Sequence, residues 1–366
     1  MSQQSGGKTQ TFRDVALDAL RAENSDGAER SRFAQNERFC LFADADGVEK
    51  GVEFLLAFPD ASESDPSSQL DAQISLCSNG RPILDGIWRV ELTVDGRRLE
   101  PRSAWETTCV DPSKAYAFCE RSIALEGGRR LTRRVFLAYN ESLLLLADEL
   151  VPAPRERVAP APRICRTTLS LAVETFAKND ADAREIVLAT NVFEPMKPSA
   201  QPKTRTKPRS EEEALLAEID GAPTPQGREV VLARAFPLAL PEWRADASRG
   251  EFDVSASQAG LELTAQSSGA SLFSPLLFDF NVRRAARPCS WRPLTVGERM
   301  APAKDDDAWG RRLQLGTEQY VFYASTSARP AIRSILGRNL ISDFMVGKFL
   351  ASRGVVPILD VEVDDE

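Results

Sequence analysis

Short apolar stretches recur along most of the chain from about residue 39 onward, and they alternate with turn-forming residues. Typical runs are RFCLFAD, GVEFLLAF, AQISLC, IWRVELTV and WETTCV. Runs that are rich in aromatic and β-branched residues and bounded by Gly, Asp, Asn, Ser or Pro indicate β-strands. In WRVELTV the apolar residues fall at every second position, which is the period of a strand with one buried face. About eighteen such strands are predicted, with turns every eight to fourteen residues.

The stretch YAFCERSIALEGGRRLTRRVFLAYNESLLLLADEL, residues 116–150, predicts three consecutive strands. Residues 126–129 are rich in glycine and form the first turn, and Asn140 and Glu141 form the second. The four leucines at 143–146 indicate burial on both faces of the sheet. The charged residues between the apolar ones are expected on a solvent-exposed face or at strand ends, which favours a scaffold over an active site. These charges are Glu120, Arg121, Arg133 and Arg134.

The pattern predicts an all-β protein, a large antiparallel β-sandwich of two layers with many strands, because no strand alternates with a long helix. Two short helices are expected, one amphipathic helix near the N-terminus and one inserted helix at SEEEALLAEIDG. Residues 1–34 are predicted to form a disordered tail and the first helix, and residues 35–366 a single sandwich domain. Residues 151–163 are rich in proline and mark an internal boundary, while residues 195–227 form a surface excursion.

Composition narrows the class of protein. The chain has 366 residues, 42% of them hydrophobic, and a formal net charge of −8. Such a charge disfavours nucleic acid and anionic membranes as partners. No apolar stretch approaches the roughly 20 residues of a membrane helix. The N-terminus is polar and lacks the apolar region of a signal peptide, so a cytoplasmic location is expected.

The sequence contains no histidine. This removes histidine-based nucleophilic catalysis and the usual catalytic zinc sites, and leaves acid–base work to Asp, Glu, Lys, Tyr or Cys. The six cysteines form no CxxC pair and are expected to be buried free thiols, with Cys109 and Cys119 as an alternative redox pair. SGGKT lacks the spacing of a P-loop, and DADG lacks the ligands of a calcium loop. No cofactor and no metal site are predicted.

Two clusters combine arginines with aromatic or polar residues, NVRRAARPCSWRP and ARPAIRSILGRNLISDF. Arginine forks bind carboxylate, sulfate or phosphate, and tryptophan offers a stacking face for a ring. The alternative is pairing within the protein, which has 54 acidic residues. The predicted binding residues are Arg283, Arg284, Arg287, Trp291, Arg292, Arg333 and Arg338.

Several segments carry a resemblance to known families, among them LTRRVFLAYNESLLLLADEL, FPLALPEWRAD, WRPLTVGE and ILGRNLISDFMVGKF. Beyond about residue 35 the chain resembles an uncharacterised family of planctomycete-type bacterial proteins, which implies a bacterial source and no particular activity. It is also weakly similar to the β-sandwich region of heparinase II/III-type polysaccharide lyases. The helical toroid and the histidines of those lyases have no counterpart here, so the resemblance transfers no catalytic residue.

Two functions follow as hypotheses. The first is a non-catalytic binding or structural protein that acts through its surface, with a protein or an acidic glycan as partner. The second is a carbohydrate-active enzyme or accessory module that acts on an acidic polysaccharide. An enzyme of this kind requires one of the four tyrosines beside an arginine and a carboxylate. The lack of histidine and of a complete catalytic motif favours the first hypothesis.

Overall fold

The predicted strands form four antiparallel sheets in the part of the chain that the structure describes. The computed structural model describes residues 33–42, 52–59, 68–153, 162–193, 227–304, 307–327 and 331–362. The all-β prediction is confirmed. The tail, both predicted helices and nearly all of the surface excursion lie outside the described residues. Among the described residues, none of the helices has the length and hydropathy that crossing a bilayer requires.

Two sheets of eight strands form the larger part of the molecule. The first sheet contains, in spatial order, β1 (Phe33–Phe42), β2 (Val52–Pro59), β3 (Ala72–Ser78), β4 (Arg81–Val94), β10 (Arg163–Leu171), β15 (Gly260–Ser267) and β14 (Gly250–Val254), with β5 (Arg97–Arg98) paired to β4. The central sheet contains β11 (Thr175–Asn179), β12 (Ile186–Phe193), β13 (Gly227–Pro237), β16 (Leu272–Asp279), β9 (Leu143–Val151), β8 (Arg130–Ala138), β7 (Tyr116–Ala124) and β6 (Glu106–Pro112).

Two smaller sheets follow. The third sheet contains β17 (Cys289–Pro293), β20 (Ala308–Leu315), β21 (Glu318–Ser325), β24 (Ser342–Leu350) and β25 (Gly354–Glu362). The small sheet contains β19 (Ala301–Pro302), β18 (Gly297–Glu298), β22 (Arg333–Ile335) and β23 (Arg338–Leu340). A short 3-10 helix, η3 (Glu126–Gly128), connects β7 to β8, and its Gly127 has a φ of 72° that favours glycine.

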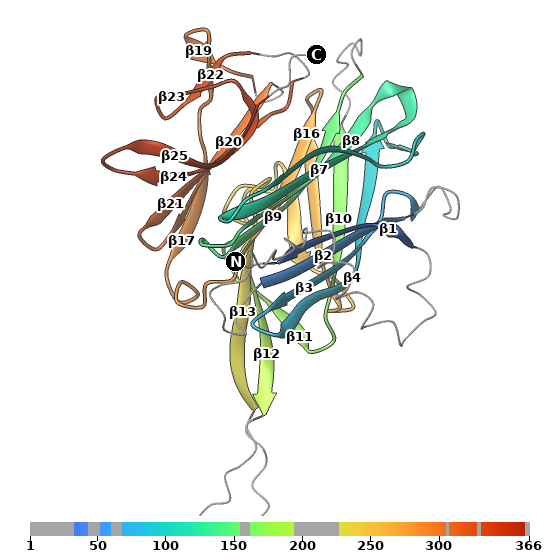
Figure 1. Ribbon diagram of the computed structural model, residues 1–366, viewed down its shortest axis with the longest axis vertical. Helices are drawn as coiled ribbons and strands as arrows, with labels where there is room; N and C mark the ends of the chain where they lie inside the picture. Colours follow the sequence, from blue (N-terminus) through green and yellow to red (C-terminus); the bar gives the residue numbers. More distant parts are fainter. Residues whose placement is uncertain are drawn as a thin grey trace, which may run out of the picture.

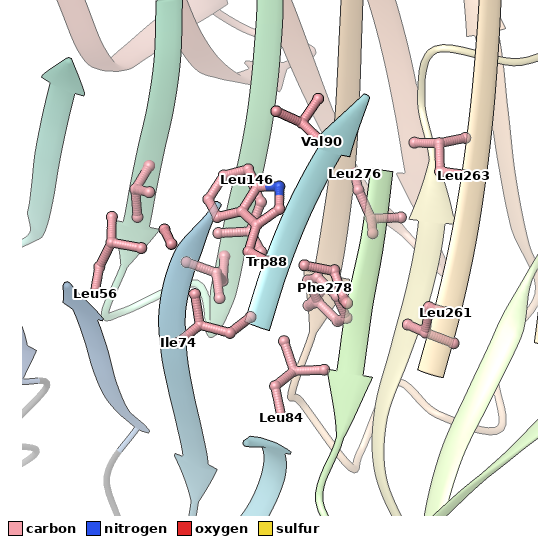
Figure 2. Packing of buried hydrophobic residues seen from close by; sticks show 14 of the residues in the cluster. Leu56, Ile74, Leu84, Trp88, Val90, Leu146, Leu261, Leu263, Leu276 and Phe278 are labelled. Carbon is pink, nitrogen blue, oxygen red and sulfur yellow. The ribbon is translucent and has the colours of Figure 1, made fainter. Parts of the chain in front are cut away.

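The sheets are stacked in the order first, central, third and small (Figure 1). One hydrophobic cluster fills the space between the first and central sheets, with Trp88 of β4 facing Leu146 and Phe278 (Figure 2). A second cluster joins the opposite face of the central sheet to the third sheet. The sequence predicted two layers. The structure has further layers, because the central sheet is apolar on both faces and is covered on both, and the small sheet packs on the third.

Strand β9 shows how one short run supplies two cores. Leu144 and Leu146 lie in the cluster beneath the first sheet, while Leu143 and Leu145 lie in the cluster beneath the third. Successive side chains of a strand point to opposite faces, so a continuous leucine run contributes equally to both. The predicted burial of residues 143–146 on both faces is confirmed, as is the meander β7–β8–β9.

The predicted exposure of the charged residues in this meander is wrong. Arg121, Arg133 and Arg134 are 4%, 1% and 6% exposed. Glu120 is half-buried. A sheet that is covered on both faces leaves no solvent-exposed face for these charges. Arg133, Arg134 and Glu120 are instead paired with one another or with carboxylates of β9, while Arg121 donates to the hydroxyl of Thr107.

Arg133 and Arg134 are adjacent and point to opposite faces of the central sheet. Arg133 Nε lies 2.8 Å from Asp148 Oδ1, directly across on β9, and its guanidinium lies 4.0 Å from the ring centre of Trp88. Arg134 Nε lies 2.6 Å from Glu120 Oε2 and also pairs with Glu149. Each buried charge therefore has an opposite charge on the neighbouring strand, which offsets the cost of removing it from water.

We expect Asp148→Ala to lower the free energy of unfolding by about 3–5 kcal/mol, because Arg133 would remain buried without its carboxylate. The matched control is Glu229→Ala, which removes the exposed ion pair to Lys178 and should cost at most about 1 kcal/mol. Urea unfolding followed by circular dichroism measures both values. Equal losses in the two variants would contradict the structural role of the Arg133–Asp148 pair.

Candidate functional site

The segment between β16 and β17, residues 281–288, carries three of the predicted binding arginines, and we name it the arginine turn. Its shape is fixed by side chains that accept backbone hydrogen bonds. Asp279 Oδ1 accepts from the Asn281 amide at 3.0 Å, and Asn281 Oδ1 accepts from the Arg283 amide at 3.0 Å. Asx side chains that bond to the backbone two residues onward favour such turns. The turn therefore holds its arginines in fixed positions.

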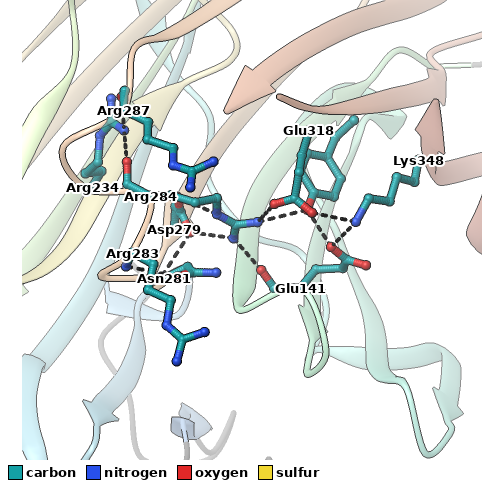
Figure 3. Close-up of polar contacts among 10 residues, drawn as sticks. Glu141, Arg234, Asp279, Asn281, Arg283, Arg284, Arg287, Glu318 and Lys348 are labelled. Carbon is teal, nitrogen blue, oxygen red and sulfur yellow. Dashed lines mark hydrogen bonds and ion pairs between the residues drawn. The ribbon is translucent and has the colours of Figure 1, made fainter. Parts of the chain in front are cut away.

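Arg284 is the buried centre of the arginine turn (Figure 3). Its Nη2 lies 2.7 Å from Asp279 Oδ1, and its Nη1 lies 2.7 Å from Glu318 Oε2 and 2.9 Å from the hydroxyl of Tyr320. A further bond goes to the carbonyl of Glu141 in the β8–β9 turn. Arg284 therefore joins the central sheet to the third sheet.

Lys348 of β24 completes this network. Its Nζ lies 2.9 Å from Glu141 Oε2 and 2.7 Å from Glu318 Oε1. The Tyr320 hydroxyl donates to the carboxylate of Glu141. Burial and this hydrogen bond raise the pKa of Tyr320. Although burial acts in the opposite direction, hydrogen bonds from Lys348 and Arg284 lower the pKa of Glu318. The Tyr320 phenol thus lies within a network of ion pairs that Arg284 and Lys348 form with the surrounding carboxylates.

Arg234 of β13 supports the arginine turn from the interior. Its Nη1 donates to the carbonyls of Arg284 at 3.0 Å and Arg287 at 2.9 Å, and its Nη2 lies 2.8 Å from Glu185 Oε2. The Cys289 thiol also donates to Glu185, at 3.0 Å. Burial, with this hydrogen bond to a carboxylate, raises the pKa of Cys289, so the thiol remains protonated.

Cys109 and Cys119, the alternative redox pair, form no disulfide. On strands β6 and β7, Cys119 lies opposite Val110, while Cys109 lies opposite Glu120. The two thiols therefore point to opposite faces of the sheet. Burial raises the pKa of Cys119 to about 12, which keeps it unreactive near neutral pH.

Besides Arg284, two of the predicted binding residues are buried, Trp291 and Arg333. Trp291 is 2% exposed, packs edge-on against Phe236, and donates its indole N–H to the carbonyl of Leu240 at 3.0 Å. A ligand ring cannot stack on it without opening the core. Arg333 is 2% exposed and lies in the small sheet, while Arg338 of the same sheet is only partly buried.

The small-sheet arginines are paired within the protein. Arg333 Nη1 lies 2.7 Å from Ser325 Oγ and 3.2 Å from the Tyr323 hydroxyl, and its Nε lies 3.2 Å from Glu298 Oε2. Arg338 Nη2 lies 3.0 Å from Asp360 Oδ2. These residues are on different elements from the arginine turn. The fold therefore does not unite the two predicted clusters through a shared polar network among the described residues.

The remaining predicted residues are exposed. The side chains of Arg283, Arg287 and Arg292 are on the surface, and none forms an ion pair with any carboxylate that the structure describes. Arg283 and Arg287 leave the turn in different directions (Figure 3). The Arg287 side chain lies against Gly316, where a Cβ would be 2.7 Å from its Cδ. These three arginines are free to meet an external anion.

The constellation that an enzyme would need does exist, but it is inaccessible. Tyr320 lies beside Arg284 and Glu141, and Tyr323 lies beside Arg333. Both tyrosines are 0% exposed. A general base must reach the proton it abstracts, and its pKa should lie near the operating pH. Burial raises the pKa of both phenols.

Two residues were missed in the sequence, the exposed Trp243 and the half-buried Arg312. Trp243, in the segment between β13 and β14, is 54% exposed. Its neighbour Glu242 accepts a hydrogen bond from the Trp291 amide and lies within electrostatic reach of Arg292. Arg312 of β20 is directly opposite Arg292 of β17. The proline before Glu242 is a local signal for an exposed turn, whereas the Arg292–Arg312 register depends on strand pairing and has no local signal.

No family model and no curated protein matches the sequence. Among solved structures, heparinase III is weakly similar, with a TM-score of 0.41, 8% identity, and coverage of 80% of this chain and 42% of that one. The heparan sulfate lyase HepC from Pedobacter heparinus has a TM-score of 0.40 and 8% identity, and the match covers 80% of this chain and 42% of HepC. The heparinase III BT4657 gene product has a TM-score of 0.41 and 8% identity, and the match covers 86% of this chain and 48% of that one. The chain thus spans less than half the length of these lyases. The resemblance to planctomycete-type proteins stays a prediction.

We expect that no tyrosine of the native protein ionises near pH 10, the usual range for an exposed phenol. Burial raises the pKa of all four tyrosines, that of Tyr116 to about 12. Because each phenol ionises more easily in the unfolded chain, its contribution to stability is full below pH 10 and is lost as the pH rises further. Tyrosinate absorbance during alkaline titration measures this.

The same titration of the protein in guanidinium chloride is the control, and all four phenols should then ionise near pH 10. If Tyr320 or Tyr323 ionised in the native protein below pH 10, it would contradict the inaccessibility of these two residues. The hypothesis of a tyrosine-based enzyme would then be supported again.

Proposed function

We propose that this chain is a non-catalytic binding protein that holds an acidic polysaccharide through exposed arginines. The observation that carries the proposal is the exposure of Arg283, Arg287 and Arg292 without a described carboxylate partner. Most arginines of the interior are paired, as Arg133 and Arg284 are. Unpaired guanidinium forks on the surface are suited to carboxylate and sulfate groups.

The surroundings favour a binding role. The arginine turn is braced by Asp279, Arg284 and Arg234, so its exposed side chains project from a backbone that is already fixed. Preorganisation reduces the entropy that a ligand must overcome on binding. Trp243 adds an exposed indole on which a sugar ring can stack. An acidic protein is the other partner class, and the test below separates the two.

The alternative is an enzyme that acts on the same polysaccharide. One observation favours it, the placement of Tyr320 beside Arg284 and Glu141. It requires the cluster to open, because Tyr320 is 0% exposed. A rise in reducing ends on incubation with an acidic polysaccharide, abolished by Tyr320→Phe while binding persists, would establish the enzyme and overturn the non-catalytic proposal.

We expect the protein to be retarded in native gels that contain heparin or polygalacturonate, and to migrate freely in gels with neutral dextran. The double variant Arg287→Gln, Arg292→Gln should lose about tenfold or more in affinity for each arginine, since hydrogen bonds to charged groups contribute about 1.5–3 kcal/mol. Mobility as a function of polysaccharide concentration gives the affinity.

The matched control is Arg97→Gln, Arg353→Gln. Both residues are exposed, and they lie on β5 of the first sheet and in the β24–β25 turn, so the change in net charge is the same. Binding should survive in this variant. Equal loss in both double variants would show attraction to general positive charge, and equal mobility of the wild type in all gels would leave an acidic protein as the remaining partner.

A further inference from the structure

Arg292 and Arg312 form an unusual pair of like charges. They lie directly opposite each other on the antiparallel strands β17 and β20. Opposite residues on one face of such a pair have Cβ atoms about 4.5–5.5 Å apart, and like charges at these positions repel each other. Neither side chain forms an ion pair with a described carboxylate. No ion pair within the described part of the chain therefore offsets this repulsion.

The direction of both side chains follows from their neighbours. Trp291 and Leu313 lie opposite each other in the cluster that faces the central sheet. Because side chains alternate along a strand, Arg292 and Arg312 point to the outer face of the third sheet. Arg311 confirms the alternation, since its Nε donates inward to the carbonyl of Leu238 at 3.0 Å.

The small sheet covers only part of this outer face. At Gly310, a Cβ would lie 3.0 Å from Val296 and 3.1 Å from Ile335, so the small sheet is in close contact there. Arg312 is the next residue on the same face, and it is only half-buried, while Arg292 is exposed. The two guanidinium groups thus stand at the border between a covered apolar surface and solvent.

The next rung of the ladder is polar. Ser290 lies opposite Gln314, and both are half-buried. Gln314 Nε2 donates to the carbonyl of Gly316 at 3.0 Å, which fixes this side chain beside the arginines. Neither residue brings a negative charge to the pair, and both carry hydroxyl or amide groups that can bond to an oxyanion.

Glu242 is a described carboxylate within electrostatic reach of Arg292. It accepts a hydrogen bond from the Trp291 amide at the edge of β17, and it is 8% exposed. Its effect on Arg292 is electrostatic, without an ion pair between them. Arg312 is not among the groups that act on Glu242.

We infer that Arg292 and Arg312 act as a two-arginine clamp that holds a single oxyanion group, a sulfate or a carboxylate, of the anionic ligand. The inference rests on the proposed function, and it identifies a specific subsite with a residue outside the originally predicted set. Two forks at this spacing can donate to different oxygens of one anion. The bound anion would remove the repulsion that the free protein retains.

The test uses inorganic sulfate as the probe and measures the thermal midpoint by differential scanning fluorimetry. Sodium chloride at equal ionic strength corrects for screening, and the exposed Arg97→Gln variant corrects for the general stabilising effect of sulfate. We expect sulfate to raise the midpoint of the wild type and of Arg97→Gln in a saturable manner. Arg292→Gln and Arg312→Gln should each lose this rise, and the double variant should lose no more than either single one.

A second readout needs no ligand. In low salt, Arg312→Gln should have a higher midpoint than the wild type because the like-charge contact is removed. Arg312→Lys keeps the charge but not the fork, so it should keep the repulsion and lose most of the sulfate response. Comparison of sulfate, phosphate and acetate shows whether the clamp prefers a tetrahedral or a planar anion.

The outcomes separate the clamp from the proposed function. A sulfate response that survives in Arg312→Gln overturns the clamp, even if polysaccharide binding depends on Arg287. A response lost in both single variants supports the clamp, even if no polysaccharide retards the protein and the proposed function fails. If both variants lose the sulfate response but bind polysaccharide as the wild type does, the assignment of the clamp to that ligand is overturned.

Discussion

The burial of the central sheet on both faces is the constraint on which the rest of the structure depends. Such a sheet has no solvent-exposed face for charged residues, yet β8 carries Arg133 and Arg134 at its middle. Both are accommodated because β9 places Asp148 and Glu149 within reach, one on each face. Removing Asp148 would leave the charge of Arg133 uncompensated in a region of low dielectric, while Arg134 is shared between Glu149 and Glu120. The stacking of the sheets therefore requires these paired charges as well as the leucines around them.

The same principle governs the junction with the third sheet. Arg284 and Lys348 face the carboxylates of Asp279, Glu318 and Glu141. A network in which each charge has a partner specifies one arrangement of the two sheets, whereas purely apolar packing tolerates small shifts. The contacts that hold Arg284 at this junction also hold the arginine turn in place. The turn therefore contains a structural residue, Arg284, between the candidate binding residues Arg283 and Arg287.

The strands could be predicted from the sequence, but the partners of the buried charged residues could not. The runs at 116–124, 130–138 and 143–151 have strong β propensity and clear turns between them, so the meander could be predicted. The two exposed-looking arginines of β8 could not be placed, because alternation of charged and apolar residues does not show whether a second layer covers the sheet. Layer number depends on contacts between strands far apart in the chain.

The candidate site shows the same limit. Arg283 and Arg284 are adjacent and identical in type, yet Arg283 is exposed and Arg284 is buried. Which of them turns inward is set by Asp279 and Glu318, whose positions come from the sheet pairing. Likewise, Trp291 resembles a surface ring next to three arginines, but β17 directs it into the core. The predicted set contained exposed residues, and the pattern alone could not separate them from the buried ones.

A catalytic group needs both a suitable pKa and access to substrate. Tyr320 and Tyr323 are 0% exposed and lack that access in this structure. Tyr320 and Tyr323 lie inside, where burial raises their pKa values and holds the phenols neutral. Arg283, Arg287 and Arg292 lie on the surface, and none of them forms an ion pair with a described carboxylate. Interior polar networks that are fully paired stabilise the fold, while the unpaired surface arginines retain their capacity for an external anion.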